Sequence, residues 1–270
     1  MRLLPAAAAL ALGAILWHYA RPAPLREGLS FSRAAYARDG RLLRLTLSAD
    51  GKHRLWVPLA DMSPRLVSAV LLNEDRRFRL HPGFDPFSLA RSIWTTYIAK
   101  TRRRGGSTIT MQLARLKYGM DSSRPRGKLL QILRALQLEA YYSKDEILAA
   151  YLNLAPYGGN IEGAGAASIV YFGKDVGRLD LSEAITLSVI PQNPIKRAMT
   201  ESDKARRDEL DAARGRLYAR WIEKHPQDAR RGEALETPWD VRRRRELPFA
   251  APHFVRRALA STKQDRALTT

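Results

Sequence analysis

The chain has 270 residues, of which 46 are lysine or arginine and 27 are aspartate or glutamate, so its formal net charge is 46 − 27 = +19. Hydrophobic residues make up 45% of the chain, which excludes disorder throughout and allows one large domain with appendages. The absence of cysteine excludes a disulfide scaffold, a thiolate metal site and a cysteine nucleophile. The positive charge indicates an anionic partner: a nucleic acid, an acidic membrane surface or a phosphate-bearing substrate.

The amino-terminal segment has the features of a membrane anchor. Residues 3–17 are uncharged and mostly apolar, a length between that of a signal-peptide core and that of a spanning helix. Trp17 and Tyr19 stand where interfacial aromatic residues are found, and small-x-small cleavage spacing before Arg21 is poor. We expect residues 1–20 to be an uncleaved transmembrane anchor; a buried amino-terminal helix is the alternative.

The next segment, residues 21–61, is predicted to be a tether followed by a small β-hairpin. In this segment Leu43, Leu45 and Leu47 alternate with polar residues, which is the period of a strand. Asp50 and Gly51 form a turn signal, and residues 55–57 are predicted to be the returning strand.

Residues 62–200 have helical periodicity and form the predicted main body, so the fold class is mainly α. One apolar face comprises Leu66, Val67, Val70 and Leu71. Capping boxes are predicted at Ser143 with Glu146 and at Asp180 with Glu183, and Ser107 is predicted to cap another helix. Residues 201–270 are expected to be a basic extension with one amphipathic helix and a frayed end.

Three polar clusters are candidates for chemistry. Residues 73–83 contain a carboxylate beside arginine and histidine, a pattern typical of a general base or of a solvated helix end with local ion pairs. Residues 102–112 place arginines and two glycines before a helix start, which favours an anion site or an ordinary capped loop. Lys128 and Gln131 share one helix face, which is either functional or simply solvated.

Taken together and in order, these clusters resemble the peptidoglycan glycosyltransferase family (glycosyltransferase family 51). The first motif of the family is matched by Glu74, Asp75, Phe78, His81 and Gly83. The second is matched by Gly105, Gly106, Ser107, Thr108, Ile109, Thr110 and Gln112. The fourth is matched by Ser143, Lys144, Ile147, Leu148, Tyr151 and Asn153, and a later Tyr-Phe-Gly-Lys stretch by residues 171–174. Within the family, the chain resembles the transglycosylase module of the penicillin-binding protein 1C branch in residues 134–139, 155–159 and 189–194.

Two departures from the family pattern stand out. The third motif usually ends in a second important glutamate, and Gln131 stands at that position here, while Lys128 is kept. This change weakens any scheme in which a second carboxylate binds a metal beside the diphosphate. The acyl-transfer signature Ser-x-x-Lys is absent from the 270 residues, so the chain is expected to be a stand-alone transglycosylase without a transpeptidase domain.

The resemblance implies a lysozyme-like fold and polymerisation of lipid II by inverting transfer onto the 4-hydroxyl of its GlcNAc, with release of undecaprenyl diphosphate. Glu74 is implied as the base, and Gln131 occupies the second catalytic position. The implied substrate-binding residues, some of them as supports of the cleft, are Asp75, Phe78, Ser107, Thr108, Gln112, Arg115, Arg124, Arg126, Lys128 and Asn153. No metal ligand is assigned, no cofactor is certain, and assistance by a divalent cation such as Mg²⁺ or Mn²⁺ is left open.

The implied partners are lipid II, the nascent glycan strand and the membrane, with other cell-wall synthesis proteins left open and no nucleic acid. The implied location is the cytoplasmic (inner) membrane, crossed once, with the catalytic domain on the periplasmic side. Two rival functions remain at this point: a lysozyme-like enzyme that cleaves glycan, and a catalytically weak membrane scaffold of a cell-wall synthesis complex. Nucleic-acid binding is the third and weakest rival function. It requires basic residues interleaved with aromatic residues, but aromatic residues are only 8% of the chain and the basic residues accompany the family motifs.

Overall fold

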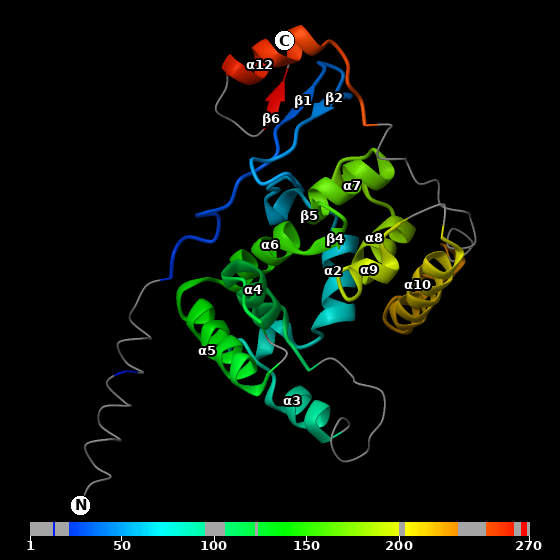
Figure 1. Cartoon of the computed structure of the whole chain (residues 1–270). Helices are drawn as coiled ribbons and strands as arrows, with labels where there is room; N and C mark the ends of the chain where they lie inside the picture. The colour runs from blue at the N-terminus through cyan, green and yellow to red at the C-terminus, as the bar shows by residue number, and fades with distance from the viewer. Residues whose placement is uncertain are drawn as a thin grey trace, which may run out of the picture. The chain divides into compact units, whose positions relative to one another are not determined.

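The computed structural model describes residues 13, 22–94, 106–121, 124–199, 203–231, 247–261 and 266–268. This part of the chain is mainly helical, with only short strands, as the sequence predicted (Figure 1). It divides into two compact units, one within Met1–Glu27 and Arg77–Tyr151, the other within Gly28–Arg76 and Leu152–Thr270. The first unit is called the 77–151 unit below, and the second the α2 unit.

The anchor predicted at residues 1–20 lies outside the described residues except for Gly13. Among the described residues, none of the helices combines the length and the apolar character that crossing a membrane requires. Arg102–Arg104, Gly105 and the basic run at 242–245 also lie outside the described residues.

The 77–151 unit is built from helices. They are the short 3-10 helix η2 (Phe78–Leu80), α3 (Pro86–Ile93), α4 (Ile109–Tyr118), α5 (Pro125–Tyr141) and most of α6 (Lys144–Leu154). Helices α4 and α5 pack against each other (Figure 1). The predicted capping box before α6 is present, since the Glu146 carboxylate accepts from the Ser143 N–H at 2.8 Å and the Ser143 hydroxyl oxygen accepts from the Glu146 N–H at 3.3 Å.

The cap of α4 differs from the prediction. Thr108, not Ser107, is the N-cap: its Oγ1 accepts from the Met111 N–H at 3.1 Å and donates to the Gly83 carbonyl at 2.6 Å. Gly83 has a φ of +105°, and a Cβ there would lie 2.8 Å from the Ala135 carbonyl oxygen, so glycine is required. A cap oxygen must reach an N–H two or three positions along the helix, and only the Thr108 side chain is placed to do so. Ser107 is therefore left for another contact.

The α2 unit contains the remaining elements. Its helices are η1 (Leu59–Asp61), α2 (Pro64–Glu74), α7 (Ala164–Phe172), η4 (Val176–Arg178), α8 (Leu181–Val189), α9 (Pro194–Arg197), α10 (Lys204–Lys224), η5 (Pro226–Arg231) and α12 (Pro252–Ser261). Helices α2, α8 and α10 pack on one another and form the core that holds the end of α2. Leu66 and Val70 are buried as predicted, whereas Val67 and Leu71 are half-buried and Ala69 and Leu72 complete the buried face. The capping box of α8, at Asp180 and Glu183, is confirmed.

The predicted hairpin is wrong in its pairing. Strand β2 (Leu42–Leu45) pairs antiparallel with β1 (Ala34–Tyr36), which lies in the predicted tether. The residues after the Asp50-Gly51 turn form β3 (His53–Arg54), which pairs in parallel with β5 (Ile161–Glu162) in a second sheet that also contains β4 (Pro156–Gly158). Strands β3 and β5 are more than 100 residues apart in the sequence, so no local pattern indicates that they pair. The alternating pattern and the turn after it are local, and they predicted a hairpin that does not form.

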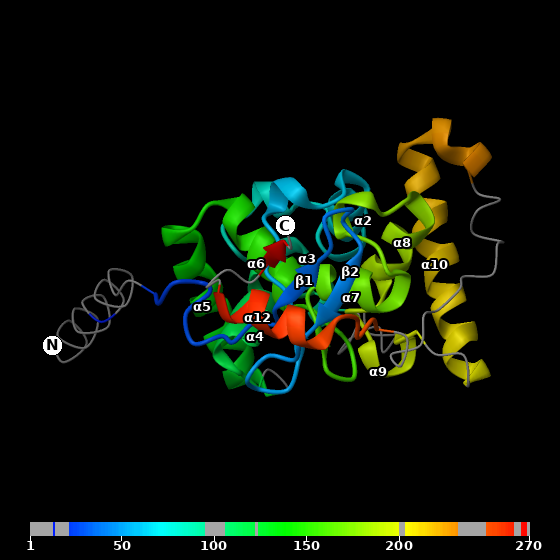
Figure 2. The same ribbon diagram turned by 90° about the horizontal axis from the view of Figure 1, so that it is seen from above.

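The end of the described chain is also ordered into the fold. Strand β6 (Arg266–Leu268) pairs in parallel with β1, which corrects the prediction of a frayed end. Helix α12 lies along this sheet (Figure 2). Its buried Val255 and Leu259 pack with Ala35, and Leu43 adds to the same small core.

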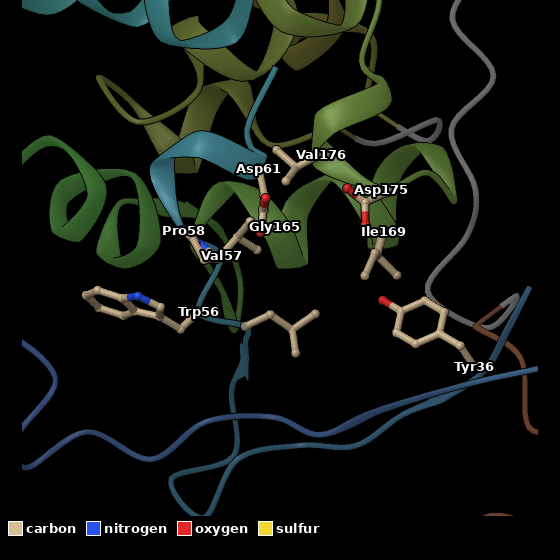
Figure 3. A pocket seen from close by; sticks show the side chains of 10 residues that line it. Tyr36, Trp56, Val57, Pro58, Asp61, Gly165, Ile169, Asp175 and Val176 are labelled. Atoms are coloured by element: carbon tan, nitrogen blue, oxygen red, sulfur yellow. The ribbon is translucent and has the colours of Figure 1, made fainter. Parts of the chain in front are cut away.

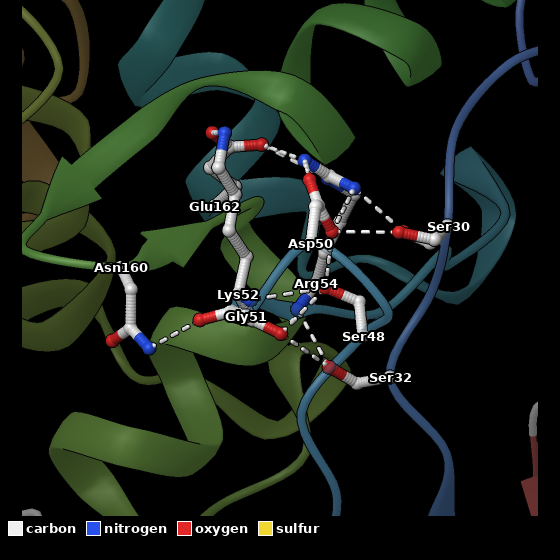
Figure 4. Close-up of polar contacts among 9 residues, drawn as sticks. All are labelled: Ser30, Ser32, Ser48, Asp50, Gly51, Lys52, Arg54, Asn160 and Glu162. Carbon is white, nitrogen blue, oxygen red and sulfur yellow. Dashed lines mark hydrogen bonds and ion pairs between the residues drawn. The ribbon is translucent and has the colours of Figure 1, made fainter.

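A buried guanidinium connects three segments of the α2 unit (Figure 4). Arg54 is 3% exposed and donates to Glu162 at 2.5 Å, to Asp50 at 3.0 Å and to the Ser30 carbonyl at 2.5 Å. Lys52 forms a further ion pair with Glu162. Hydrogen bonds from two serines and from Arg54 hold the pKa of Asp50 well below its usual range. This network fixes the segment that leads into α2.

Candidate functional site

Glu74, the predicted base, is the last residue of α2. The helix ends at Asp75, whose backbone angles of φ −159° and ψ 82° turn the chain away from the helical path. The Glu74 side chain is half-buried, and its Oε1 accepts a hydrogen bond of 3.0 Å from the Asn73 amide. The same Asn73 nitrogen donates to the Ser188 carbonyl of α8, also at 3.0 Å. Asp75 itself is buried, with 8% of its surface exposed.

A second set of residues surrounds Glu74 from the same unit. Arg220 of α10 donates from Nη2 to the Asn73 amide oxygen at 2.8 Å. Burial and the charge of Arg76 lower the pKa of the Arg220 guanidinium, and the charge of Glu74 acts in the opposite direction. Tyr157 is fully buried; burial first, and then the charge of Glu74, raises the pKa of its hydroxyl.

Sequence reasoning missed the roles of Asn73, Arg220 and Tyr157. Asn73 stood at the edge of the predicted cluster, but its sequence position says nothing about which carboxylate it faces. Arg220 lies 146 positions after Glu74, within a charge-dense segment that offers many equivalent arginines. Only the packing of α10 against α2 and α8 selects this one.

The 77–151 unit contains the second group of predicted residues, centred on Lys128 of α5. The Lys128 ammonium donates to the Ser107 hydroxyl at 2.6 Å and to the Gln131 amide oxygen at 2.9 Å. Gln131 is 1% exposed, and its nitrogen donates to the Met111 carbonyl of α4 at 2.5 Å. The two residues predicted from one helix face are therefore in direct contact, and Ser107 is brought to them by the loop before α4.

The electrostatics of this cluster are unusual for a lysine. Burial, and then the like charge of Arg115, lowers the pKa of the Lys128 ammonium to about 8. Among the described residues its hydrogen-bond partners are the neutral Ser107 and Gln131, which orient the ammonium without balancing its charge. A partly buried cation of this kind attracts an anion.

The remaining predicted residues of this unit frame the cluster. Thr108 caps α4 and is buried, and Gln112 is half-buried one turn later. Arg115 lies exposed in the last turn of α4. Arg124 and Arg126 are exposed at the start of α5, where the Arg124 carbonyl accepts from the Lys128 N–H at 3.0 Å.

Phe78 and Asn153 are both enclosed by the protein. Phe78 is 1% exposed, and the Lys144 ammonium lies 4.6 Å from the centre of its ring. Asn153 is fully buried in the α2 unit, where its amide oxygen accepts from the Val57 N–H and its amide nitrogen donates to the Val57 carbonyl, each at 2.8 Å. Their side chains thus support the segments around them.

A divalent cation does not fit the donors around Lys128. Gln131 offers a neutral amide, and the carboxylate of Glu139, further along α5, is engaged by the Thr110 hydroxyl at 2.6 Å and the Lys144 ammonium at 2.7 Å. Divalent cations such as Mg²⁺ are held mainly by carboxylate oxygens. Within the described ranges, no group of three or more histidine, aspartate or glutamate side chains is arranged to hold a metal ion.

A pocket of about 160 Å³ lies elsewhere in the α2 unit (Figure 3). Figure 3 shows the Trp56 and Tyr36 rings at its two ends and the Asp61 and Asp175 carboxylates beside its apolar lining. Its lining residues are Tyr36, Leu55, Trp56, Val57, Pro58, Asp61, Gly165, Ile169, Asp175 and Val176. None of the predicted site residues is among them.

Comparison with known proteins gives a family and several relatives. A family model described as Transglycosylase matches residues 39–217. Penicillin-binding protein 1C of Escherichia coli is 40% identical over 256 residues, which are 92% of this chain and 32% of that protein. The biosynthetic peptidoglycan transglycosylase of Pasteurella multocida is 35% identical over 174 residues, which are 64% of this chain and 68% of that protein.

A solved structure is also similar. The crystal structure of penicillin-binding protein 1A from Haemophilus influenzae aligns with a TM-score of 0.44 and 20% sequence identity, covering 86% of this chain and 24% of that chain. The chain thus spans about a third of the length of penicillin-binding protein 1C and about a quarter of that of the 1A protein.

Proposed function

Because the chain belongs to the transglycosylase family, we propose that it is a peptidoglycan glycosyltransferase that polymerises lipid II into glycan strands. The growing strand is the donor, held through undecaprenyl diphosphate at its reducing end. The 4-hydroxyl oxygen of the acceptor GlcNAc attacks the donor anomeric carbon and forms the new glycosidic bond with inversion. The bond from that carbon to the diphosphate oxygen breaks, and undecaprenyl diphosphate leaves.

Glu74 accepts the proton of the attacking hydroxyl in this proposal. An alcohol is a poor nucleophile near neutral pH and needs a positioned base. The Glu74 carboxylate is half-buried at the end of α2 and is oriented by a hydrogen bond from Asn73, which supports this role.

The Lys128 cluster carries the proposal on the side of the leaving group. The diphosphate gains negative charge as it departs, and a fixed cation stabilises that charge. Lys128 offers an ammonium held by two neutral partners, Ser107 and Gln131, with the guanidinium of Arg115 nearby. Because the donors present do not fit a divalent cation, no step is assigned to a metal.

The membrane forms part of the same proposal. A polyprenyl tail requires the enzyme to act at a bilayer, and the apolar residues 3–17 and the net charge of +19 support an anchored protein beside anionic lipid headgroups. We include in the proposal a lysozyme-like fold and a single crossing of the cytoplasmic membrane. Membrane fractions washed with high salt test the anchor, since an anchored chain stays until detergent is added, whereas a chain held only by charge is released.

The main test is a lipid II polymerisation assay on purified protein. The wild type is expected to produce glycan strands, and Glu74→Gln is expected to lose activity by at least about a hundredfold, the usual contribution of a general base. Glu27→Gln, which removes a carboxylate from an exposed site, is the matched control and keeps full activity. Full activity of Glu74→Gln contradicts the base, and cleavage of finished glycan without elongation contradicts polymerisation.

A further inference from the structure

We propose that Asn73 and Arg220 are positioning residues: Arg220, from α10, fixes the Asn73 amide, and that amide fixes the Glu74 carboxylate for proton transfer. The inference rests on the proposed role of Glu74. It also assigns a part in the reaction to α10, which lies in the region from residue 201 onward that sequence reasoning treated as a basic extension.

The Asn73 amide has only one satisfactory orientation. Its nitrogen donates to the Glu74 carboxylate and to the Ser188 carbonyl, both at 3.0 Å, and both of these oxygens only accept. Its oxygen accepts from Arg220 at 2.8 Å, and a guanidinium only donates. A flipped amide would place oxygen against two acceptors and nitrogen against a donor. The partners from α8 and α10 therefore determine where the donor to Glu74 points.

Glu74 needs such a donor because of its place in the helix. A helix carries partial negative charge at its carboxyl end, which disfavours a carboxylate there. Glu74 is the last residue of α2, and the last turn contains no basic residue. The Asn73 amide and the nearby Arg220 charge offset this unfavourable position and leave the carboxylate in one direction.

Helix α10 holds Arg220 firmly enough for this task. Leu217 and Trp221, on either side of Arg220 in the sequence, are buried, and the Trp221 ring nitrogen donates to Asp228 at 3.0 Å. The Arg220 Nε also donates to the Arg216 carbonyl at 3.3 Å. The guanidinium thus has hydrogen bonds both to its own helix and to Asn73, and its half-buried stem restricts it further.

Three variants test the proposal in the full-length protein. Arg220→Ala is expected to lower kcat for lipid II polymerisation about tenfold with KM within twofold, because the carboxylate loses its fixed orientation but substrate contacts remain. Arg220→Lys keeps one donor and is expected to recover part of the loss. Asn73→Asp has nearly the same shape and still accepts from Arg220, but it cannot donate to Glu74 and adds a like charge, so its kcat is expected to fall more than that of Arg220→Ala.

A double variant separates this relay from a general loss of stability. Asn73→Ala and Arg220→Ala are measured singly and together. If Arg220 acts through Asn73, the double variant is expected to lower kcat no more than the stronger of these two single variants does. Arg216→Ala is the matched control, since it removes an exposed charge from the same helix one turn earlier and keeps the carbonyl that Arg220 contacts. Circular dichroism and thermal unfolding check that each variant is folded.

The outcomes distinguish this inference from the proposed function. If the wild type polymerises lipid II and Glu74→Gln does not, but folded Arg220→Ala and Asn73→Asp keep the wild-type kcat, the positioning role is overturned and the proposed function stands. Additive losses in the double variant, or a rise in KM with unchanged kcat, also overturn it. If Glu74→Gln is fully active, the base role of Glu74 fails and this inference fails with it, whereas polymerisation by the wild type still stands.

Discussion

At the scale of single residues, Gln131 is a neutral partner that orients the Lys128 ammonium and leaves its charge unbalanced. Gln131 holds the ammonium in place at 2.9 Å without balancing its charge, and burial lowers the pKa of Lys128 to about 8. A glutamate at this position would balance the charge and favour the protonated form. The Lys128 ammonium is therefore held in one position, and its positive charge is available to an anion mainly below a pH of about 8.

The first prediction concerns the pH dependence of anion binding. A diphosphate binds the protonated form of Lys128, so its affinity is expected to be full well below pH 8 and to fall as the pH rises through about 8. Isothermal titration of the protein with inorganic pyrophosphate between about pH 6.5 and 9.5 measures this. Lys128→Arg is the control, because a guanidinium keeps its proton over the whole range and the fall is expected to disappear. A wild-type affinity that is constant up to pH 9.5 contradicts the prediction.

The second prediction concerns Gln131→Glu. The new carboxylate would pair with Lys128 and raise the pKa of its ammonium, so the fall in affinity moves to higher pH. Below pH 8 the affinity for pyrophosphate is expected to drop roughly tenfold, since one added negative charge near the anion costs on the order of 1.4 kcal/mol. The same titration measures both effects. An unchanged affinity below pH 8 would show that Lys128 does not face the anion.

At the scale of secondary-structure elements, the start of α4 separates two neighbouring hydroxyls. The sequence predicted Ser107 as the cap, and the backbone path gives that role to Thr108 instead. Thr108 makes the cap and the bond to Gly83, while Ser107 contacts Lys128. One residue thus serves the fold and its neighbour serves the site.

The third prediction follows from this division of roles. Thr108→Ala is expected to lower the free energy of unfolding by about 1–3 kcal/mol, because it loses the helix cap and leaves the buried Gly83 carbonyl without its donor. Ser107→Ala is expected to change stability by less than about 0.5 kcal/mol and to weaken pyrophosphate binding instead. Urea unfolding with pyrophosphate titration measures both quantities. Equal loss of stability in the two variants contradicts the assignment.

Helix α10 shows what helical periodicity does and does not predict. The sequence predicted one amphipathic helix in this region, and its apolar residues Leu210, Leu217 and Trp221 are all buried. Their burial against α2 and α8 brings Arg220 to Asn73, which the periodicity alone does not reveal. An element can therefore be predicted correctly while its partner in the site is missed.

At the scale of the whole molecule, the last described segment completes a sheet that begins near residue 34. Strand β6 adds to β1, and α12 covers the sheet with Val255 and Leu259. These residues are more than 200 positions from Ala34–Tyr36 in the sequence. Such distant pairing makes the carboxyl-terminal residues part of the folded α2 unit.

The fourth prediction tests this closure. Val255→Asp is expected to lower the free energy of unfolding by at least about 2 kcal/mol or to release α12 locally, because Val255 is fully buried and an unpaired carboxylate there is costly. Phe254→Asp, at the adjacent 50% exposed position, is the matched control and is expected to change stability by less than about 0.5 kcal/mol. Urea unfolding and limited proteolysis measure the difference. Equal resistance of Val255→Asp and the wild type to both would show that α12 does not cover the sheet in solution.

The sequence by itself determined the mainly helical class, the capping boxes at Ser143 and Asp180, and the order of the motifs around Glu74, Ser107 and Lys128. These features depend on residues close together in the chain, where periodicity and spacing carry the information. Tertiary structure alone decided that β1 pairs with β6, that Ser107 contacts Lys128, and that Arg220 orients Asn73 beside Glu74. Those contacts join residues from 21 to more than 200 positions apart, and such pairs are selected by the packing of buried faces rather than by any local pattern.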